Sequence, residues 1–127
     1  MNQPLHIGFL LFPLVTQLDL TGPAQVLSRL RNARVDLVWR SRDPVQTDSG
    51  FALLPTATLD EIEKADILCV PGGFGCVGVM EDDEVLGWVR DGSLNVRIGA
   101  EFALEHAADA HRALEGRQTT GKVLLLP

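Results

Sequence analysis

The chain has 127 residues, of which 46% are hydrophobic, enough for one domain with a moderate core but not for two. No apolar run is long enough to span a bilayer, and residues 1–15 lack the features of a secretory signal, so we expect a cytoplasmic protein. The net charge is −6 and the basic residues are scattered, which argues against nucleic acid and anionic membranes as main partners.

The first elements predict a strand followed by a helix. Residues 5–12 are apolar on both faces, as in a central strand of a parallel sheet, and the run ends at Pro13. A helix is predicted over residues 21–30, with Thr21 as its cap and Pro23 in its first turn.

The next elements continue this alternation. Residues 35–39 predict a strand, and residues 44–54 predict a hairpin around the turn signal at 48–50. Residues 58–61 open a short helix with a capping box, and residues 65–70 form another strand. The order of elements is that of a doubly wound α/β sheet, in which ligands bind at the carboxyl ends of the strands.

Two such carboxyl ends carry candidate site residues. Asp19 lies between two leucines after the first strand, where a carboxylate could have a raised pKa and act as an acid or base; it could equally cap the turn. Gly72 and Gly73 follow a later strand and predict either a tight turn or N–H groups presented to a developing negative charge. Gly73-Phe74-Gly75 does not match a phosphate-binding fingerprint.

The cysteines and histidines predict no metal site. Cys69 and Cys76 form no C-x-x-C pair, and His6, His106 and His111 are too far apart for a ligand motif. Cys69 is expected to be a small core residue within its strand.

Several stretches of the first two thirds of the chain closely resemble the DJ-1/PfpI superfamily, and within it the isonitrile (isocyanide) hydratases. The stretches that carry this resemblance are residues 8–13 (GFLLFP), 17–23 (QLDLTGP), 35–39 (VDLVW), 43–45 (DPV), 66–73 (DILCVPGG) and 80–82 (MED). The resemblance is expected to end near residue 82. It implies a flavodoxin-like (class I glutamine amidotransferase-like) parallel sheet, no cofactor, and a lyase that hydrates an isocyanide to an N-substituted formamide. Asp19 would be its acid, and Gly72 and Gly73 its oxyanion turn.

The resemblance also implies a nucleophilic cysteine on a strand-to-helix elbow in the next β-α unit, but no cysteine follows Cys76. Cys76 lies in the glycine-rich turn and is not favoured as a replacement for the missing nucleophile, since neither a strained elbow nor a fixed base is expected there. We therefore expect the chain to be inactive as written. The alternative is a non-catalytic fusion fragment or a binding module that forms a homodimer.

The final third predicts a helix that ends at Gly92, a strand over 94–98, a helix over 104–114 that stops at Gly116, and a closing strand over 121–127. Residues 86–127 resemble the C-terminal end of medium-chain quinone oxidoreductases. The stretches concerned are residues 88–92 (WVRDG), 96–99 (VRIG), 107–115 (AADAHRALE) and 119–125 (TTGKVLL).

A cofactor site is not expected in this tail, because no G-x-G-x-x-G motif follows a strand. An NADPH-dependent quinone reductase is thus the weakest alternative. The economical explanation of the two resemblances is a join near residues 81–86 between a DJ-1/PfpI-like part (1–82) and the tail (86–127). The alternative explanation is that the chain belongs to one continuous, unfamiliar family. We expect a single domain over 1–127, in which the β-α-β tail completes a truncated sheet or dimerisation covers the exposed surface.

Overall fold

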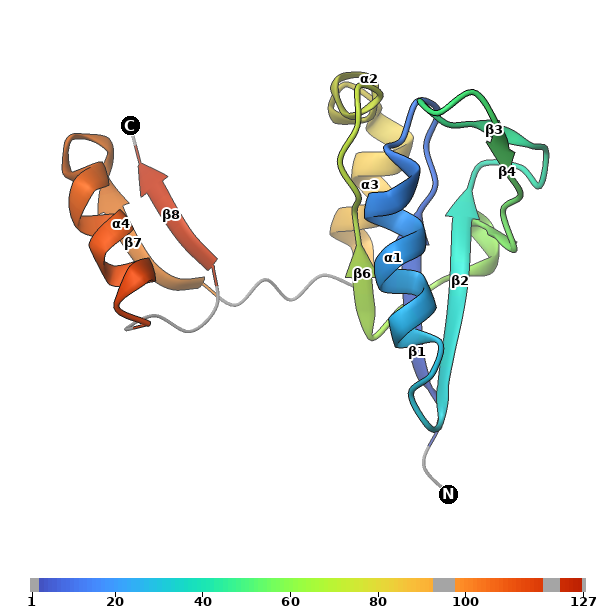
Figure 1. Cartoon of the computed structure of the whole chain (residues 1–127), viewed down its shortest axis with the longest axis horizontal. Coiled ribbons are helices and arrows are strands. Elements are labelled where there is room, and N and C mark those ends of the chain that lie inside the picture. The colour runs from blue at the N-terminus through green and yellow to red at the C-terminus, as the bar shows by residue number, and fades with distance from the viewer. Residues whose placement is uncertain (1–2, 93–97, 118–121, 127) are drawn as a thin grey trace. The chain divides into compact units, whose positions relative to one another are not determined.

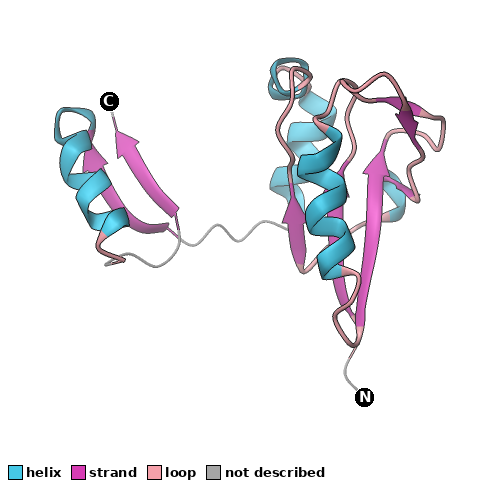
Figure 2. Cartoon of the chain, viewed as in Figure 1, coloured by secondary structure: helices cyan, strands magenta, loops and turns pink. Residues whose placement is uncertain are grey.

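The computed structural model describes residues 3–92, 98–117 and 122–126. The chain divides into two compact units, Met1–Leu94 and Asn95–Pro127, here called unit 1 and unit 2. Both units contain strands and helices (Figure 1, Figure 2). None of the described helices has the length and apolar character that a transmembrane span requires.

Unit 1 is built on a four-stranded parallel sheet in the order β5-β2-β1-β6. Its strands are β1 (Leu5–Leu10), β2 (Ala33–Trp39), β5 (Ala57–Thr58) and β6 (Ile67–Cys69). Ile7 of β1 pairs with Val35 on one side and Ile67 on the other. The prediction of a central, doubly covered first strand is confirmed, because Ile7, Phe9 and Leu10 are all buried.

Helices supply the rest of the core of unit 1. They are α1 (Gln17–Leu27), the short η1 (Leu59–Glu61), α2 (Cys76–Met80) and α3 (Asp83–Gly92). Helix α1 lies in front of β1 in Figure 1 and buries Leu20. Helix α3 buries Val85, and Trp88 Nε1 donates a hydrogen bond of 2.9 Å to the carbonyl oxygen of Ile62. The structure describes this helix as far as Gly92 and the residues that follow lie outside the described part of the chain, so its predicted end at Gly92 stays a prediction.

The predicted hairpin and capped turn are also present. Strands β3 (Val45–Gln46) and β4 (Ala52–Leu53) pair antiparallel, and Gly50 between them has φ +83°, a conformation that favours glycine. In the capping box of η1, the backbone N–H of Thr58 donates to Glu61 Oε2 at 2.8 Å.

The predicted start of α1 is wrong. The helix begins at Gln17, and Thr21 is an interior residue whose hydroxyl donates to the carbonyl oxygen of Gln17 at 2.9 Å. Pro23 therefore lies inside the helix rather than in its first turn. It cannot donate a hydrogen bond to the carbonyl of Asp19, but the loss of this one bond leaves the remaining helix intact.

Unit 2 is a β-α-β arrangement. It contains β7 (Ile98–Ala103), the short η2 (Leu104–His106), α4 (Ala107–Glu115) and β8 (Lys122–Leu126), and β7 pairs parallel with β8. The predicted helix, its stop at Gly116 and the closing strand are confirmed. The predicted strand over 94–98 lies outside the described residues except for Ile98, which begins β7.

The two strands of the tail pair with each other. Among the described residues of unit 2, β7 and β8 form a two-stranded parallel sheet, and the completion of the sheet of unit 1 by this tail stays a prediction. The division into compact units falls after Leu94, and the join near residues 81–86 stays a prediction. Burial of Val85 in the core of unit 1 ties α3 to that unit.

Candidate functional site

The two segments that follow the carboxyl ends of strands β1 and β6, both singled out in the sequence, lie against each other. One is the crossing that follows β1 (residues 11–16), and the other is the glycine turn that follows β6 (residues 71–75). The backbone N–H of Thr16 donates to the carbonyl oxygen of Gly72 at 3.0 Å. Helix α1 begins directly after this contact, which places its first turn beside the glycine turn.

Asp19 stands against Gly72. Its Oδ2 atom lies 2.8 Å from the position that a Cβ would occupy at Gly72, so any side chain there would displace the carboxylate. The predicted apolar enclosure of Asp19 is wrong, because Asp19 and Leu18 are exposed and only Leu20 is buried. The first turn of α1 directs residue 20 toward the core and residues 18 and 19 outward.

Gly73 has φ +140°, and a Cβ there would lie 2.6 Å from both the carbonyl oxygen of Leu14 and the backbone nitrogen of Thr16. Gly73 also forms an isolated antiparallel bridge with Val15. These contacts support the interpretation as a tight turn. In the described part of the chain, the N–H groups of Gly72 and Gly73 donate to no protein acceptor. The predicted oxyanion role of these N–H groups stays a prediction.

The two cysteines are free and half-buried. Cys76 begins α2, and its Sγ donates to the carbonyl oxygen of Pro71 at 3.6 Å. No hydrogen bond joins Cys76 to Asp19 within the described ranges. Cys69 lies in β6, where burial raises the pKa of its thiol.

A pocket of about 330 Å³ adjoins the crossing and the glycine turn, and sequence reasoning missed it. Its lining residues come from four segments: Pro13, Leu14, Trp39, Arg40, Gly75, Gly78, Val79 and Asp82. An aromatic residue at the carboxyl end of the strand over 35–39 was the signal in the sequence that could have indicated it.

A polar cluster around Asp36 on β2 was also missed. Asp36 is buried, and its Oδ2 accepts hydrogen bonds from His6 Nε2 at 2.8 Å and from Arg34 Nε at 2.7 Å, while Thr56 Oγ1 donates to Oδ1 at 2.8 Å. Burial alone would raise the pKa of Asp36, but the hydrogen bonds from Thr56, His6 and Arg34 outweigh it and lower the pKa. A charged residue inside an apolar strand was the available signal.

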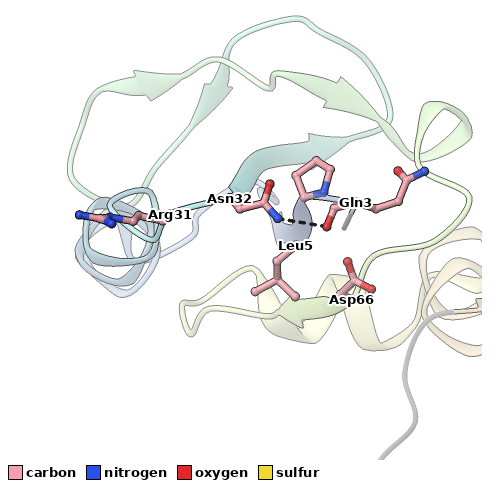
Figure 3. Close-up of a pocket in the computed structure, with 6 residues that line it drawn as sticks. Gln3, Leu5, Arg31, Asn32 and Asp66 are labelled. Carbon is pink, nitrogen blue, oxygen red and sulfur yellow. Dashed lines mark hydrogen bonds between the residues drawn. The ribbon is translucent and has the colours of Figure 1, made fainter. Parts of the chain in front are cut away.

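A third feature lies at the opposite end of the sheet. Figure 3 shows a pocket of about 500 Å³ at the amino end of β1, where Asn32 Nδ2 donates to the carbonyl oxygen of Gln3 at 3.3 Å. Because ligands of parallel α/β sheets bind at the carboxyl ends of the strands, we assign the candidate site to the glycine turn. Within the described ranges, no group of three or more His, Cys, Asp or Glu residues could hold a metal ion.

Comparison with known proteins shows the family to which the chain belongs. A model of the DJ-1/PfpI family matches residues 6–125, so the likeness extends well beyond residue 82, where the sequence resemblance was expected to end. An isonitrile hydratase of Pseudomonas putida is 46% identical over 93 residues, which is 73% of this chain and 41% of that protein. The chain thus spans less than half the length of this relative.

The tail has a further likeness. A quinone oxidoreductase of Pseudomonas aeruginosa is 44% identical over 45 residues, which is 35% of this chain and 14% of that protein. The alignments with the hydratase and the oxidoreductase together exceed the length of the chain, so part of the chain is similar to both.

Solved structures show the same fold. A ThiJ/PfpI family protein from Pseudomonas syringae has a TM-score of 0.68 and 28% identity, over 79% of this chain and 50% of that one. A putative transcriptional regulator from Vibrio parahaemolyticus has a TM-score of 0.60 at 15% identity, over 97% of this chain and 77% of that one, and shows the fold alone. The family match and the flavodoxin-like parallel sheet lead to one conclusion: the chain belongs to the DJ-1/PfpI family.

Proposed function

We propose that this chain is a DJ-1/PfpI protein of the isonitrile hydratase type that, as it stands, binds an isocyanide at the glycine turn without hydrating it. The observation that carries the proposal is the contact between Asp19 and Gly72. The carboxylate of Asp19 lies 2.8 Å from the position that a Cβ would occupy at Gly72. Beside it are two backbone N–H groups without a protein acceptor among the described residues. A carboxyl group and hydrogen-bond donors thus lie at one place.

Hydration of an isocyanide adds water across the terminal carbon and the nitrogen, giving an N-substituted formamide. In the proposed thiol route, a thiolate adds to the carbon, Asp19 supplies the proton, and the N–H groups of Gly72 and Gly73 stabilise the developing negative charge. Water then attacks the resulting thioimidate and releases the thiol. The cysteine that directly follows the glycine turn is Cys76, and its Sγ donates to the carbonyl oxygen of Pro71 rather than engaging Asp19. For this reason we propose binding without turnover.

The test combines an activity assay with a binding assay. Loss of the isocyanide stretching band and appearance of the formyl proton of the product should proceed no faster than in buffer, for the chain and for Cys76→Ser alike. In nuclear magnetic resonance, the amide signals of Gly72 and Gly73 should shift on addition of an isocyanide. Asp19→Asn should weaken this response, whereas Asp60→Asn, which changes another exposed carboxylate, should leave it unchanged.

Two results would contradict the proposal. Turnover that Cys76→Ser abolishes would make the chain a thiol-dependent enzyme and assign the nucleophile to Cys76. Unchanged Gly72 and Gly73 signals at saturating isocyanide would remove the binding function.

Homodimerisation is favoured by a separate observation. Strand β6 lies at the edge of the sheet of unit 1. Its first residue, Ile67, is 39% exposed, and Val70, which directly follows the strand, is 53% exposed. Exposed strand edges with apolar side chains are typical of association surfaces. We propose that a second copy covers this edge. Sedimentation should show a defined dimer that Val70→Lys weakens, and a monomer at high concentration would end the proposal.

A further inference from the structure

We propose that a separate pocket, near the amino ends of β1 and β2, binds a small zwitterion that carries the ammonium and carboxylate groups of an α-amino acid. The pocket has a volume of about 440 Å³, and ligand pockets start at about 300 Å³. It is lined by His6 of β1, Arg34 of β2 and the consecutive residues 60–64, which begin in η1. It is therefore distinct from the candidate site, which follows the carboxyl ends of β1 and β6.

A buried carboxylate holds the two side chains that the strands contribute to this pocket. His6 and Arg34 are neighbours in the register of β1 and β2, and both contact Asp36 Oδ2, at 2.8 Å and 2.7 Å. Asp36 is 5% exposed, and Thr56 donates to its other oxygen. A buried charge is costly unless hydrogen bonds compensate it, so its partners are held in one geometry. His6 and Arg34 are thus preorganised for a ligand, which lowers the entropic cost of binding.

The same carboxylate determines which nitrogen of His6 remains available. Burial alone would raise the pKa of Asp36, but the hydrogen bonds from Thr56, His6 and Arg34 lower it, and the group is ionised at neutral pH. An ionised carboxylate only accepts hydrogen bonds, so Nε2 of His6 carries the hydrogen of this contact. When the imidazole is neutral, Nδ1 is then an acceptor, and it has no partner among the described residues.

Two cations are available to the carboxylate of a ligand. Arg34 contacts Asp36 through Nε, and its terminal amino groups have no hydrogen-bond or ion-pair partner within the described ranges. Lys64 is exposed and has no ion-pair partner in the part of the chain that the structure describes. Guanidinium groups bind the two oxygens of a carboxylate in a planar fork, and the ammonium of Lys64 adds a point charge.

Two carboxylates are available to the ammonium group of a ligand. Asp60 and Glu63 are exposed, and neither forms an ion pair with a described residue. Glu61 between them is already paired with Arg42, at 2.8 Å. Together with Nδ1 of His6, the two free carboxylates provide acceptors for an ammonium group. Because free groups of both signs line one pocket, a zwitterion satisfies both, whereas a simple anion or a simple cation satisfies only one.

Three probes of similar size separate the two charges. L-alanine carries both groups, propionate lacks the ammonium group, and ethylamine lacks the carboxylate. In nuclear magnetic resonance, alanine should shift the imidazole signal of His6 and leave those of His106 and His111, which do not line the pocket, unchanged. Propionate and ethylamine should each bind at least about tenfold more weakly, because each lacks one set of charge-assisted hydrogen bonds.

Variants test where alanine binds. Arg34→Gln and Lys64→Gln should each weaken alanine binding, Arg34→Gln at least about tenfold. Arg31→Gln is the matched control, because Arg31 is an exposed arginine that lines the pocket of Figure 3 and not this one. Thermal melts check folding. Should Arg34→Gln melt much earlier, because Asp36 loses a partner, Lys64→Gln decides, since Lys64 makes no ion pair with the described residues.

Three outcomes would overturn the proposal. Equal binding of alanine and propionate would make the pocket an anion site, and equal binding of alanine and ethylamine would make it a cation site. An unchanged His6 signal at saturating alanine, or binding that Arg31→Gln weakens while Arg34→Gln and Lys64→Gln do not, would remove the pocket assignment. None of these results bears on isocyanide binding at the glycine turn, which is tested through Gly72 and Gly73.

Discussion

The carboxyl end and the amino half of the sheet of unit 1 are stabilised in different ways. At the carboxyl end, backbone packs on backbone, and the contact exists only where side chains are absent, as at Gly73 and Gly75. In the amino half, side chains make the contacts, through the hydrogen bonds that converge on the buried Asp36. The first region should thus be sensitive to added atoms, and the second should respond to acid.

The largest effect is expected at Gly75. A Cβ there would lie 1.8 Å from the carbonyl oxygen of Pro13, a backbone atom that cannot move aside without displacing the crossing. Gly75→Ala should therefore lower the free energy of unfolding by more than about 3 kcal/mol. Gly78→Ala, three residues later in open space, should raise it by up to about 1 kcal/mol, because alanine is the better helix former. Urea unfolding followed by tryptophan fluorescence measures both.

The opposite signs of the two alanine variants make the comparison informative. Equal effects of Gly75→Ala and Gly78→Ala would show that the glycine turn does not pack on the crossing as described.

A smaller effect is expected at Asp36. Asp36→Asn keeps the shape of the side chain and its hydrogen-bonding capacity toward Thr56, but it removes the charge that His6 and Arg34 contact. We expect a loss of about 1–2 kcal/mol near neutral pH. The matched control is Asp60→Asn, an exposed carboxylate, which should stay within about 0.5 kcal/mol.

The stabilisation of the folded chain by Asp36 should depend on pH. The pKa of Asp36 is lower in the folded chain than its ordinary value, so the folded state binds a proton less readily than the unfolded state. The stabilisation is therefore fully present above the unfolded pKa of about 3.9, and it is lost as the pH falls through the folded pKa. Asp36→Asn should flatten the unfolding free energy in this acidic range. An unchanged acid profile would contradict the role of Asp36.

The alternation of strands and helices could be predicted because it depends on local patterns. The doubly apolar run at 5–12 and the capping box at Thr58 are complete within a few residues. The start of α1 could not be predicted in this way. The start signal at residues 21–23 competes with the crossing before it, and the geometry of that crossing is set by the contact between Thr16 and Gly72 of a distant turn. Local rules do not contain that contact.

The site was predicted only as far as single segments allow. Asp19, Gly72 and Gly73 were found because each follows a strand, but the exposure of Asp19 depends on where α1 begins. The cluster around Asp36 requires the register between β1 and β2, and the pocket requires four segments at once. Equally, nothing in the tail pattern distinguishes strands that extend a sheet from strands that pair with each other.

A further prediction concerns the attachment of α3 to unit 1. Trp88→Phe keeps an aromatic ring in the core but removes the hydrogen bond to the carbonyl oxygen of Ile62. The free energy of unfolding should fall by about 1 kcal/mol, measured by circular dichroism in urea. No change would mean that the hydrogen bond from Trp88 contributes little to the stability of unit 1.

The mildest effect is a difference in reactivity between the two thiols. Cys69 is partly buried in β6, and burial raises the pKa of its thiol, so its reactive thiolate is scarce at pH 8. In Cys76→Ser, which retains only Cys69, alkylation by iodoacetamide should be several-fold slower in the folded chain than in urea. Cys69→Ser, which retains only Cys76, provides the comparison at the glycine turn. Equal folded and unfolded rates for Cys69 would show that the edge of β6 opens freely, and the proposed covering of that edge by a second copy would then lose its structural basis.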